Sequence, residues 1–243
     1  MEGIAAYHLW KSYGGRIILR DVTLHIPPGG RAALWGPSGT GKTTLLRLFL
    51  RLETPDRGTV TGPEQWAAVF QEDRLLGHLD SLSNLRLALG RAYRADAAAE
   101  LLDALGIAEC PVLSDRSEPP KPSELPVRCV GETNRHAREK GMGKRVRDYS
   151  GGMRRRLALA RALLSPAQAL ALDEPFTGLD EDSRRRCVEA VSRLGAGRTI
   201  LLASHDPRDA ADLGARTLDL SEWSGLPGTG TREGTYPPLS GTE

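Results

Sequence analysis

The stretch that most constrains the fold is Gly36–Thr43, GPSGTGKT, which matches the pattern GxxxxGK[ST]. It follows a short apolar run, RAALW, which predicts a strand, and it precedes LLRLFLRL, which predicts a helix. Glycines let such a loop curl until successive N–H groups point at one phosphate, and the helix N-terminus adds partial positive charge. The stretch therefore predicts a phosphate-binding loop between a strand and a helix.

Individual residues of this loop have predicted tasks. Lys42 is expected to reach the β- and γ-phosphates of a nucleotide, and the Thr43 hydroxyl is expected to ligate Mg²⁺. The predicted nucleotide-binding set here is Gly36, Pro37, Ser38, Gly39, Thr40, Gly41, Lys42, Thr43 and Thr44. Kinases, GTPases and motors share such loops. The only asparagines, Asn84 and Asn134, lie in no Asn-Lys-x-Asp base reader, which weakens the GTPase option.

Two adjacent carboxylates follow the apolar run LAL at residues 170–172. Ligands of open α/β sheets bind at the carboxyl ends of strands, so Asp173 is placed to hold Mg²⁺ and Glu174 to polarise a water molecule. The alternative is an acidic turn that caps the next helix. Because the two carboxylates occur in the same chain as a phosphate loop, the catalytic interpretation is favoured over this alternative.

Strands and helices alternate along much of the chain, which predicts a mainly parallel sheet. A helix from Met153 onward is expected to be capped by Ser150. The remaining predicted strands are Tyr7–Trp10, Ile17–Ile18, Val22–Ile26, Trp66–Phe70, 167–175 and 199–206, and the remaining predicted helices cover about 80–105 and Glu181–Leu194.

Length and composition limit the number of domains, the class of partner and the cellular compartment. With 243 residues the chain is near the upper size of one core, and its net charge of +2 demands neither nucleic acid nor an acidic partner. Three cysteines in no CxxC spacing predict free thiols in a reducing compartment. The N-terminus lacks the pattern of a secretory signal, and no apolar run approaches the roughly 20 residues that span a bilayer. Any membrane-spanning part is therefore expected on another chain.

Two segments depart from this regular pattern. Residues 111–148 are first rich in proline and then basic, which predicts a long loop that is mobile or functional. The basic run has no interleaved aromatic residues, so it is more typical of a solvated face than of a nucleic-acid patch. Order is expected to return at Asp148, and residues 221–243, rich in Gly, Pro, Ser and Thr, are predicted to be a disordered tail.

From about Ile4 to Leu220 the chain resembles the ATP-binding-cassette (ABC) ATPases, the nucleotide-binding subunits of ABC transporters. The resemblance rests on seven motifs in the family's order. GPSGTGKTT is similar to Walker A, LALDEP to Walker B, YSGGM to the LSGGQ signature, Gln71 to the Q-loop, Thr177–Asp180 to the D-loop, His205 to the switch histidine and Tyr13 to the adenine-stacking aromatic.

The resemblance implies a role for the two consecutive glycines at the start of a helix, which otherwise cost about 0.5–1 kcal/mol each relative to alanine. In the family, Ser150, Gly151 and Gly152 face the γ-phosphate of a nucleotide that a second subunit holds. Binding of ATP would thereby be coupled to closure of a dimer.

The same resemblance implies the catalytic roles. Glu174 would activate water, His205 would contact the γ-phosphate, Gln71 would sense the metal, Asp180 would communicate across the dimer and Lys42 would hold phosphate. The implied metal ligands are Thr43, Gln71 and Asp173, and the implied cofactors are ATP and Mg²⁺. The reaction would be phosphoryl transfer to water.

The implied fold is α/β, a P-loop NTPase (RecA-like) core with a mainly parallel sheet, an N-terminal antiparallel β subdomain and an inserted α-helical subdomain. Residues 1–220 would form one ABC ATPase domain, with 1–72 and 154–220 as the core and 73–153 as the helical subdomain, which includes 111–148. Tyr149 and Met153 replace the Leu and Gln of the signature, but neither supplies its Ser or Gly N–H groups.

Several segments, among them VFQEDRLL and ALDEPFTGLD, are most similar to the importer ATPases of the nitrate, sulfonate and taurine group. This implies an ATP-hydrolysing subunit that drives a permease for a small anion or sulfonate-like solute at the cytoplasmic face of the cell membrane. The implied partners are a second copy of the ATPase, integral membrane permease subunits and a solute-binding protein, with no nucleic acid.

Three alternatives stay open within the family. One is a soluble ABC ATPase of DNA repair or translation, although neither heptads nor a second phosphate loop occurs here. Another is the ATPase subunit of an exporter. The third is a regulatory cassette without turnover, against which the intact Lys42, Asp173, Glu174 and His205 argue.

Overall fold

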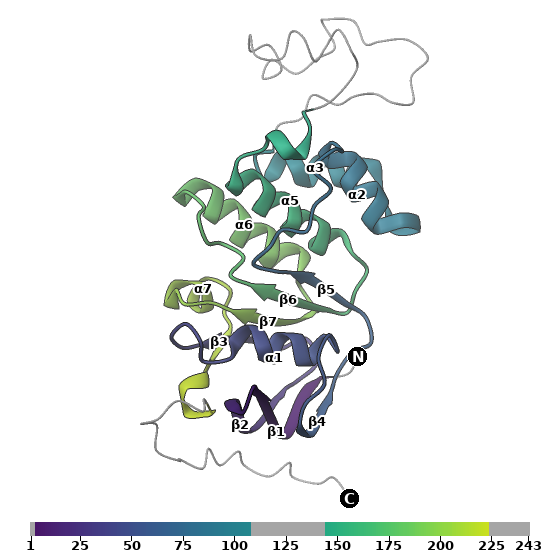
Figure 1. Ribbon diagram of the computed structural model, residues 1–243. Coiled ribbons are helices and arrows are strands. Elements are labelled where there is room, and N and C mark those ends of the chain that lie inside the picture. The colour runs from purple at the N-terminus through teal and green to yellow at the C-terminus, as the bar shows by residue number, and fades with distance from the viewer. Residues whose placement is uncertain (1–2, 108–143, 224–243) are drawn as a thin grey trace, which may run out of the picture.

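The computed structural model describes residues 3–107 and 144–223. At the base of Figure 1 lies an antiparallel sheet of β1 (Ile4–Tyr13), β2 (Arg16–Ile26) and β4 (Arg57–Thr61), in the order β2-β1-β4. Gly14 and Gly15, both with positive φ, join β1 to β2 in the two-residue turn that suits the twist of a hairpin. The predicted strands at residues 7–10, 17–18 and 22–26 fall within β1 and β2. The observed strands are longer than the predicted ones, because polar residues at their exposed positions interrupt the apolar runs on which the prediction was based.

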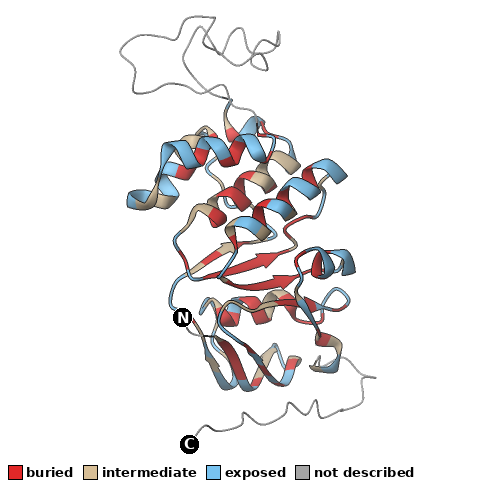
Figure 2. Cartoon of the chain, turned by 180° about the vertical axis from the view of Figure 1, so that it is seen from behind, coloured by how far each residue is buried: buried red, intermediate tan, exposed pale blue. Residues whose placement is uncertain are grey.

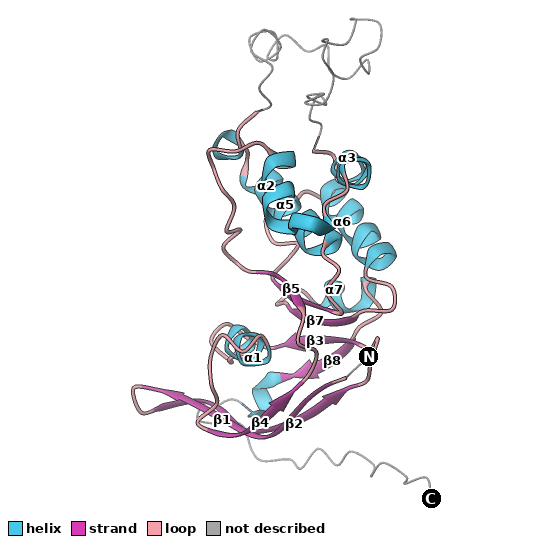
Figure 3. Cartoon of the chain, turned by 90° about the vertical axis from the view of Figure 1, so that its right-hand side faces the viewer, coloured by secondary structure: helices cyan, strands magenta, loops and turns pink. Residues whose placement is uncertain are grey.

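A second, parallel sheet forms the centre of the molecule. Its strands are β3 (Arg31–Trp35), β5 (Trp66–Val69), β6 (Ala169–Asp173), β7 (Thr199–Ala203) and β8 (Arg216–Asp219), in the order β5-β6-β7-β3-β8. Every residue of β6 and β7 is buried, which explains why both read as continuous apolar runs. Helices cover both faces of this sheet (Figure 3).

One face of the parallel sheet packs on α1 (Lys42–Phe49), which lies between the two sheets (Figure 3). The opposite face packs on α5 (Gly151–Leu164) and α6 (Glu181–Leu194), with α2 (Ser81–Leu89) and α3 (Ala95–Ala104) beyond them (Figure 1). The short α7 (Pro207–Asp212) and the 3₁₀ turns η1 (Gly90–Ala92), η5 (Val146–Asp148) and η6 (Leu220–Trp223) complete the described elements.

Alternate residues of the buried strands enter two separate hydrophobic cores. Leu170 and Leu172 belong to the core under α5 and α6, whereas Ala171 between them belongs to the core that contains α1 and the antiparallel sheet. Figure 2 shows the buried residues concentrated in the central strands and on the helix faces turned toward them. The predicted α/β fold with a parallel and an antiparallel sheet is confirmed; its division into subdomains at the stated residues stays a prediction.

Some predicted boundaries are wrong. Order returns before Asp148, because Val146 is buried and its N–H donates to Leu79 O at 2.9 Å. The tail does not begin at residue 221, since η6 extends to Trp223, which packs against the core that contains α1 and the antiparallel sheet. The remaining parts of both predicted segments, 111–143 and 224–243, lie outside the described residues.

Two smaller observations bear on the compositional predictions. Cys187 is a buried free thiol whose pKa burial raises to about 12, and Cys110 and Cys129 lie outside the described residues. Within residues 3–107 and 144–223, no helix has the length and apolar character needed to cross a bilayer.

Candidate functional site: a phosphate loop beside an acidic strand end

The phosphate loop connects β3 to α1 and turns on glycines with positive φ. Gly39 has a φ of 85° and Gly41 a φ of 96°, and a Cβ at Gly41 would lie 2.7 Å from Leu19 Cδ2. Pro37, Ser38 and Gly39 are exposed at the tip of the loop, whereas Thr40 is buried and its hydroxyl donates to Pro37 O. The loop shape predicted from GxxxxGK[ST] is therefore present.

No side chain of the described residues caps the N-terminus of α1, where Gly41 is the N-cap. The first N–H groups of an α-helix have no partner within the helix, so at this end of α1 they are available to donate hydrogen bonds to an anion. The Lys42 ammonium lies in the same place, donating to Gly36 O at 2.6 Å and Pro37 O at 3.1 Å. Positive charge and free donors thus converge at the mouth of the loop.

Thr43 and Asp173 meet at the end of β6. The Thr43 hydroxyl donates to Asp173 Oδ2 at 2.9 Å, and Asp173 is only 3% exposed. Burial raises the pKa of the Asp173 carboxyl, against the opposing effect of the hydrogen bond from Thr43. A buried carboxylate beside a hydroxyl provides the hard oxygen donors that suit Mg²⁺.

The described residues contain no cluster of three or more His, Cys, Asp or Glu that could hold a metal alone. Gln71, the third predicted ligand, follows β5, the strand hydrogen-bonded to β6, and is exposed. The two strand ends therefore place Gln71 at the same sheet edge as Asp173.

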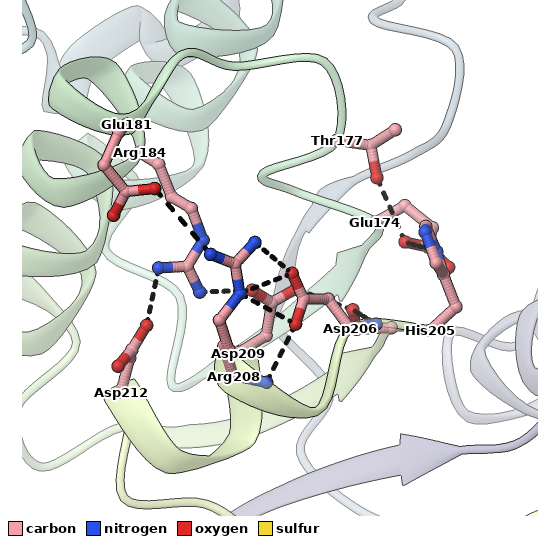
Figure 4. A network of polar contacts seen from close by, with 10 residues as sticks. Glu174, Thr177, Glu181, Arg184, His205, Asp206, Arg208, Asp209 and Asp212 are labelled. Carbon is pink, nitrogen blue, oxygen red and sulfur yellow. Dashed lines mark hydrogen bonds and ion pairs between the residues drawn. The ribbon is translucent and has the colours of Figure 1, made fainter.

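Glu174 and His205 contact each other directly. His205 Nδ1 lies 2.8 Å from Glu174 Oε2, which also accepts a hydrogen bond from the Thr177 hydroxyl at 3.1 Å (Figure 4). The hydrogen bond and the negative charge of Glu174 raise the pKa of His205. Sequence reasoning assigned separate roles to the two side chains and missed their contact.

The backbone of Glu174 has a φ of 51°, in the left-handed region that non-glycine residues avoid. Its N–H donates to Ala203 O at 2.9 Å, at the end of the neighbouring strand β7. Such strain costs on the order of 1–3 kcal/mol and persists where the surroundings fix it. It turns the chain sharply after Asp173, so that the two adjacent carboxylates occupy different places.

Tyr13 ends β1, with its ring half exposed. Its hydroxyl is hydrogen-bonded to Glu53 and lies near Thr44 in the first turn of α1, and Lys11 Nζ is 5.2 Å from the ring centroid. Partial burial, followed by the interaction with Glu53, raises the pKa of Tyr13. The predicted adenine-stacking residue therefore lies beside the helix that follows the phosphate loop.

The predicted signature turn lies elsewhere. Ser150 caps α5, as predicted, because its hydroxyl accepts from the Met153 N–H at 3.2 Å. The start of α5 is in the helical layer, on the far side of the parallel sheet from α1 (Figure 1). The structure thus brings Lys42, Thr43, Asp173, Glu174 and His205 to one sheet edge but leaves Ser150–Gly152 apart from them.

Glycine at position 151 has no explanation within the described chain. Its φ is not in the left-handed region, and apart from its neighbours and its own helix, no described atom lies within 4 Å of where a Cβ would be. At Gly152 a Cβ would meet Leu179 at 3.4 Å, beside the predicted D-loop. Asp180 caps α6 by accepting from the Ser183 N–H at 2.8 Å, which lowers the pKa of Asp180.

Sequence reasoning missed two arginines that hold the segment around Gln71. Arg155 donates to Phe70 O at 2.6 Å and to Gln71 O at 2.7 Å, and Arg161 donates to Asp73 O and Arg74 O. Residues 154–156 are a run of three arginines, which by itself resembles a solvated face. No signal in the sequence marks the middle one as buried.

Comparison with known proteins agrees with this geometry. The family described as ABC transporter matches residues 19–177. The chain is 36% identical to the aliphatic sulfonates import ATP-binding protein SsuB 1 of Rhizobium johnstonii, over 88% of this chain and 72% of that protein. It is also 36% identical to SsuB 1 of Rhodococcus jostii, over 91% of this chain and 80% of that protein.

Solved structures show the same fold. The dimeric ATP-binding cassette MJ0796 in a post-hydrolysis state with ADP and phosphate has a TM-score of 0.66 at 22% identity, covering 86% of this chain and 90% of that one. A putative ABC transporter ATP-binding protein from Pyrococcus furiosus has a TM-score of 0.68 at 18% identity, covering 92% and 100%. The matched family model, the relatives and the shared fold lead to one conclusion: this chain belongs to the ABC transporter family of ATP-binding proteins, which are ATPases.

Proposed function

We propose that this chain is the ATP-hydrolysing subunit of an importer for aliphatic sulfonates or similar small organic anions. The relatives that match most of its length are named as aliphatic sulfonate import proteins, which favours an importer over an exporter or a non-transport ATPase. Its partners would be a second copy of itself, membrane permease subunits and a solute-binding protein, at the cytoplasmic face of the membrane.

The observation that carries the proposal is the convergence at one sheet edge of an uncapped, lysine-bearing phosphate loop, the Thr43–Asp173 pair and the Glu174–His205 pair. In that order, the loop and the two pairs would each supply one requirement of phosphoryl transfer to water: charge neutralisation, metal ligation and proton acceptance. The loop donors and Lys42 would bind the β- and γ-phosphates. Thr43 and Asp173 would hold Mg²⁺, which supplies positive charge to the phosphate oxygens when bound.

Glu174 would act as the general base. In the reaction, water attacks the γ-phosphorus, its proton passes to the Glu174 carboxylate, and the bond from the γ-phosphorus to the bridging oxygen breaks to leave ADP and phosphate. In the structure described here, His205 engages that carboxylate at 2.8 Å. On binding of ATP, His205 would instead contact the γ-phosphate, which would leave the carboxylate free to accept the proton.

The second subunit enters through the signature turn. The start of α5 lies in the helical layer, on the other side of the parallel sheet from α1 (Figure 1). Apart from its neighbours and its own helix, no atom of the described residues lies within 4 Å of where a Cβ at Gly151 would be. Backbone N–H groups at the start of α5 would meet the γ-phosphate held by the partner, where the helix N-terminus favours negative charge. Each of two ATP molecules would then lie between the loop of one subunit and the signature of the other.

Three measurements test the proposal: ATP hydrolysis, nucleotide binding and solute uptake. The purified full chain should hydrolyse ATP in the presence of Mg²⁺, and Lys42→Ala should lose nucleotide affinity; unchanged binding by that variant would remove the phosphate-loop assignment. Reconstituted with its permease and binding protein, the chain should support ATP-dependent uptake of an alkanesulfonate in preference to nitrate. Uptake of nitrate alone would contradict the proposed substrate class.

A further inference from the structure

Behind His205 lies a buried polar network that links α6, α7 and the end of β7 (Figure 4). Its central residue is Asp209, which is 3% exposed, and its neighbours Ser204 and Arg184 are 3% and 8% exposed. None of these residues belongs to the seven motifs. Buried polar groups that are fully paired tend to fix one local geometry, so their position directly behind a catalytic candidate calls for an explanation.

Ser204 fixes the backbone on both sides of His205. Its hydroxyl donates to Asp209 Oδ2 at 2.6 Å and accepts from the Asp206 N–H at 3.0 Å. Its own N–H donates to Leu34 O, at the end of the neighbouring strand β3. His205 therefore lies between two residues whose main-chain positions are set by hydrogen bonds, which leaves its imidazole directed at Glu174.

Asp209 carries this arrangement to α6. Its second oxygen, Oδ1, accepts from Arg184 at 2.7 Å, and the other arm of Arg184 pairs with Asp212 Oδ2 at 2.6 Å. Arg184 is in the first turn of α6, where its backbone N–H donates to the carbonyl of Asp180 at 2.8 Å. A continuous chain of contacts therefore runs from Asp180 through Arg184, Asp209 and Ser204 to the backbone around His205.

We propose that Asp209 is a positioning residue for ATP hydrolysis, which sets the backbone of His205 through Ser204 and ties it to the D-loop residue Asp180 through Arg184. The inference rests on the proposed function, since it presumes that His205 acts on the nucleotide. These contacts would connect the D-loop residue Asp180 to His205 of the same subunit without involving the bound nucleotide.

Three single substitutions in the full chain test this inference. Ser204→Ala removes the hydroxyl that joins Asp209 to the His205 backbone, and Asp209→Asn weakens the same junction from the other side. Asp212→Asn is the matched control, because it removes a partner of Arg184 but does not touch Ser204. The measurements are kcat and KM for ATP, equilibrium binding of ATP and the thermal midpoint of unfolding.

The expected result is a loss in kcat of about 10- to 100-fold for Ser204→Ala and Asp209→Asn, since small misplacements of a reacting group carry penalties of that order. KM and equilibrium binding of ATP should stay near parental values, because the phosphate loop is not part of the network. Asp212→Asn should keep kcat within roughly twofold, as surface substitutions generally do little.

If the unmodified chain hydrolyses ATP and Ser204→Ala has the same kcat, this inference is overturned but the proposed function is not. A fall in ATP affinity or an equal loss of kcat in Asp212→Asn would also overturn this inference, since either result would assign the network a structural role only. A parental chain that does not hydrolyse ATP would instead overturn the proposed function, and this inference with it.

Discussion

At the scale of single residues, Glu174 is the side chain on which the proposed chemistry depends. Its backbone is strained, its side chain is mostly buried, and its carboxylate already accepts from Thr177 and His205. These contacts hold it at the end of β6, one residue beyond the candidate metal ligand Asp173. A general base requires such a fixed position before its basicity matters.

Replacing Glu174 with Gln tests its role as the base. The amide keeps the size of the side chain but cannot accept a proton, so kcat should fall by about 10²- to 10⁴-fold while ATP binding is retained. Steady-state hydrolysis and equilibrium binding measure the two effects. Hydrolysis at the parental rate would show that another group accepts the proton.

The contact between Glu174 and His205 also predicts a pH dependence. The pKa of His205 is raised, so the stabilisation from the pair is fully present below the unfolded-state value of about 6.5 and is lost as pH rises through the folded-state pKa. Glu174→Gln should therefore reduce the free energy of unfolding more at about pH 6 than at about pH 9. Denaturant titrations at the two pH values measure this, and an equal reduction at both would contradict the pairing.

At the scale of elements, the sequence predicted those parts whose signals are local. The continuous apolar runs of β6 and β7, the Ser150 cap of α5 and the glycines of the phosphate loop each have a sufficient cause in neighbouring residues. The edge strand β8 and the strand β4 were missed because each buries little, and the predicted helical stretch 80–105 breaks at Gly90, which has positive φ. The same holds for the site, where the residues were predicted but the contacts between them were not.

The motifs predicted Lys42, Thr43, Asp173, Glu174 and His205 as site residues, and the structure brings them to one sheet edge because strand ends in a parallel sheet coincide there. Their roles stay a prediction. The contacts that fix these side chains depend on tertiary packing and leave no periodic or compositional signal. Arg155 is an example, since only the packing of α5 against the segment after β5 brings its guanidinium to Phe70 and Gln71.

Arg155→Ala tests that contact. Removal of the guanidinium leaves two carbonyl groups without their donors, so the free energy of unfolding should fall by about 1–3 kcal/mol. Arg185→Ala is the matched control in another helix, where the side chain is exposed and pairs with the exposed Asp182, and its effect should stay within about 0.5 kcal/mol. Urea titration measures both, and equal effects would show that the Arg155 contact contributes little.

At the scale of the whole molecule, the two halves of the proposed nucleotide site lie on opposite sides of the parallel sheet. The phosphate loop leads into α1, in the layer between the sheets, and the signature turn opens α5 in the helical layer (Figure 1). The folded chain therefore holds its own signature turn and its own phosphate loop in different layers. The simplest arrangement in which both the phosphate loop and the signature turn contact one nucleotide is a site completed by a second copy of the chain.

Gly151→Ala separates folding from assembly. Because a Cβ at this position would meet no atom of the described residues beyond its neighbours and its own helix, the variant should be as stable as the parent or more stable by up to about 1 kcal/mol, as alanine favours a helix. Dimerisation in the presence of ATP and hydrolysis should nevertheless fall, since the added methyl group obstructs the approach of the γ-phosphate. A destabilised variant that still forms the dimer with ATP would contradict this assignment.

The most direct test of the account is the rate of ATP hydrolysis per chain as the full-length protein is diluted, with its mass followed by light scattering. If the site needs two copies, the rate per chain should fall on dilution in step with the fraction of dimer. A constant rate per chain in solutions shown to contain only monomers would contradict the claim that two subunits build each site.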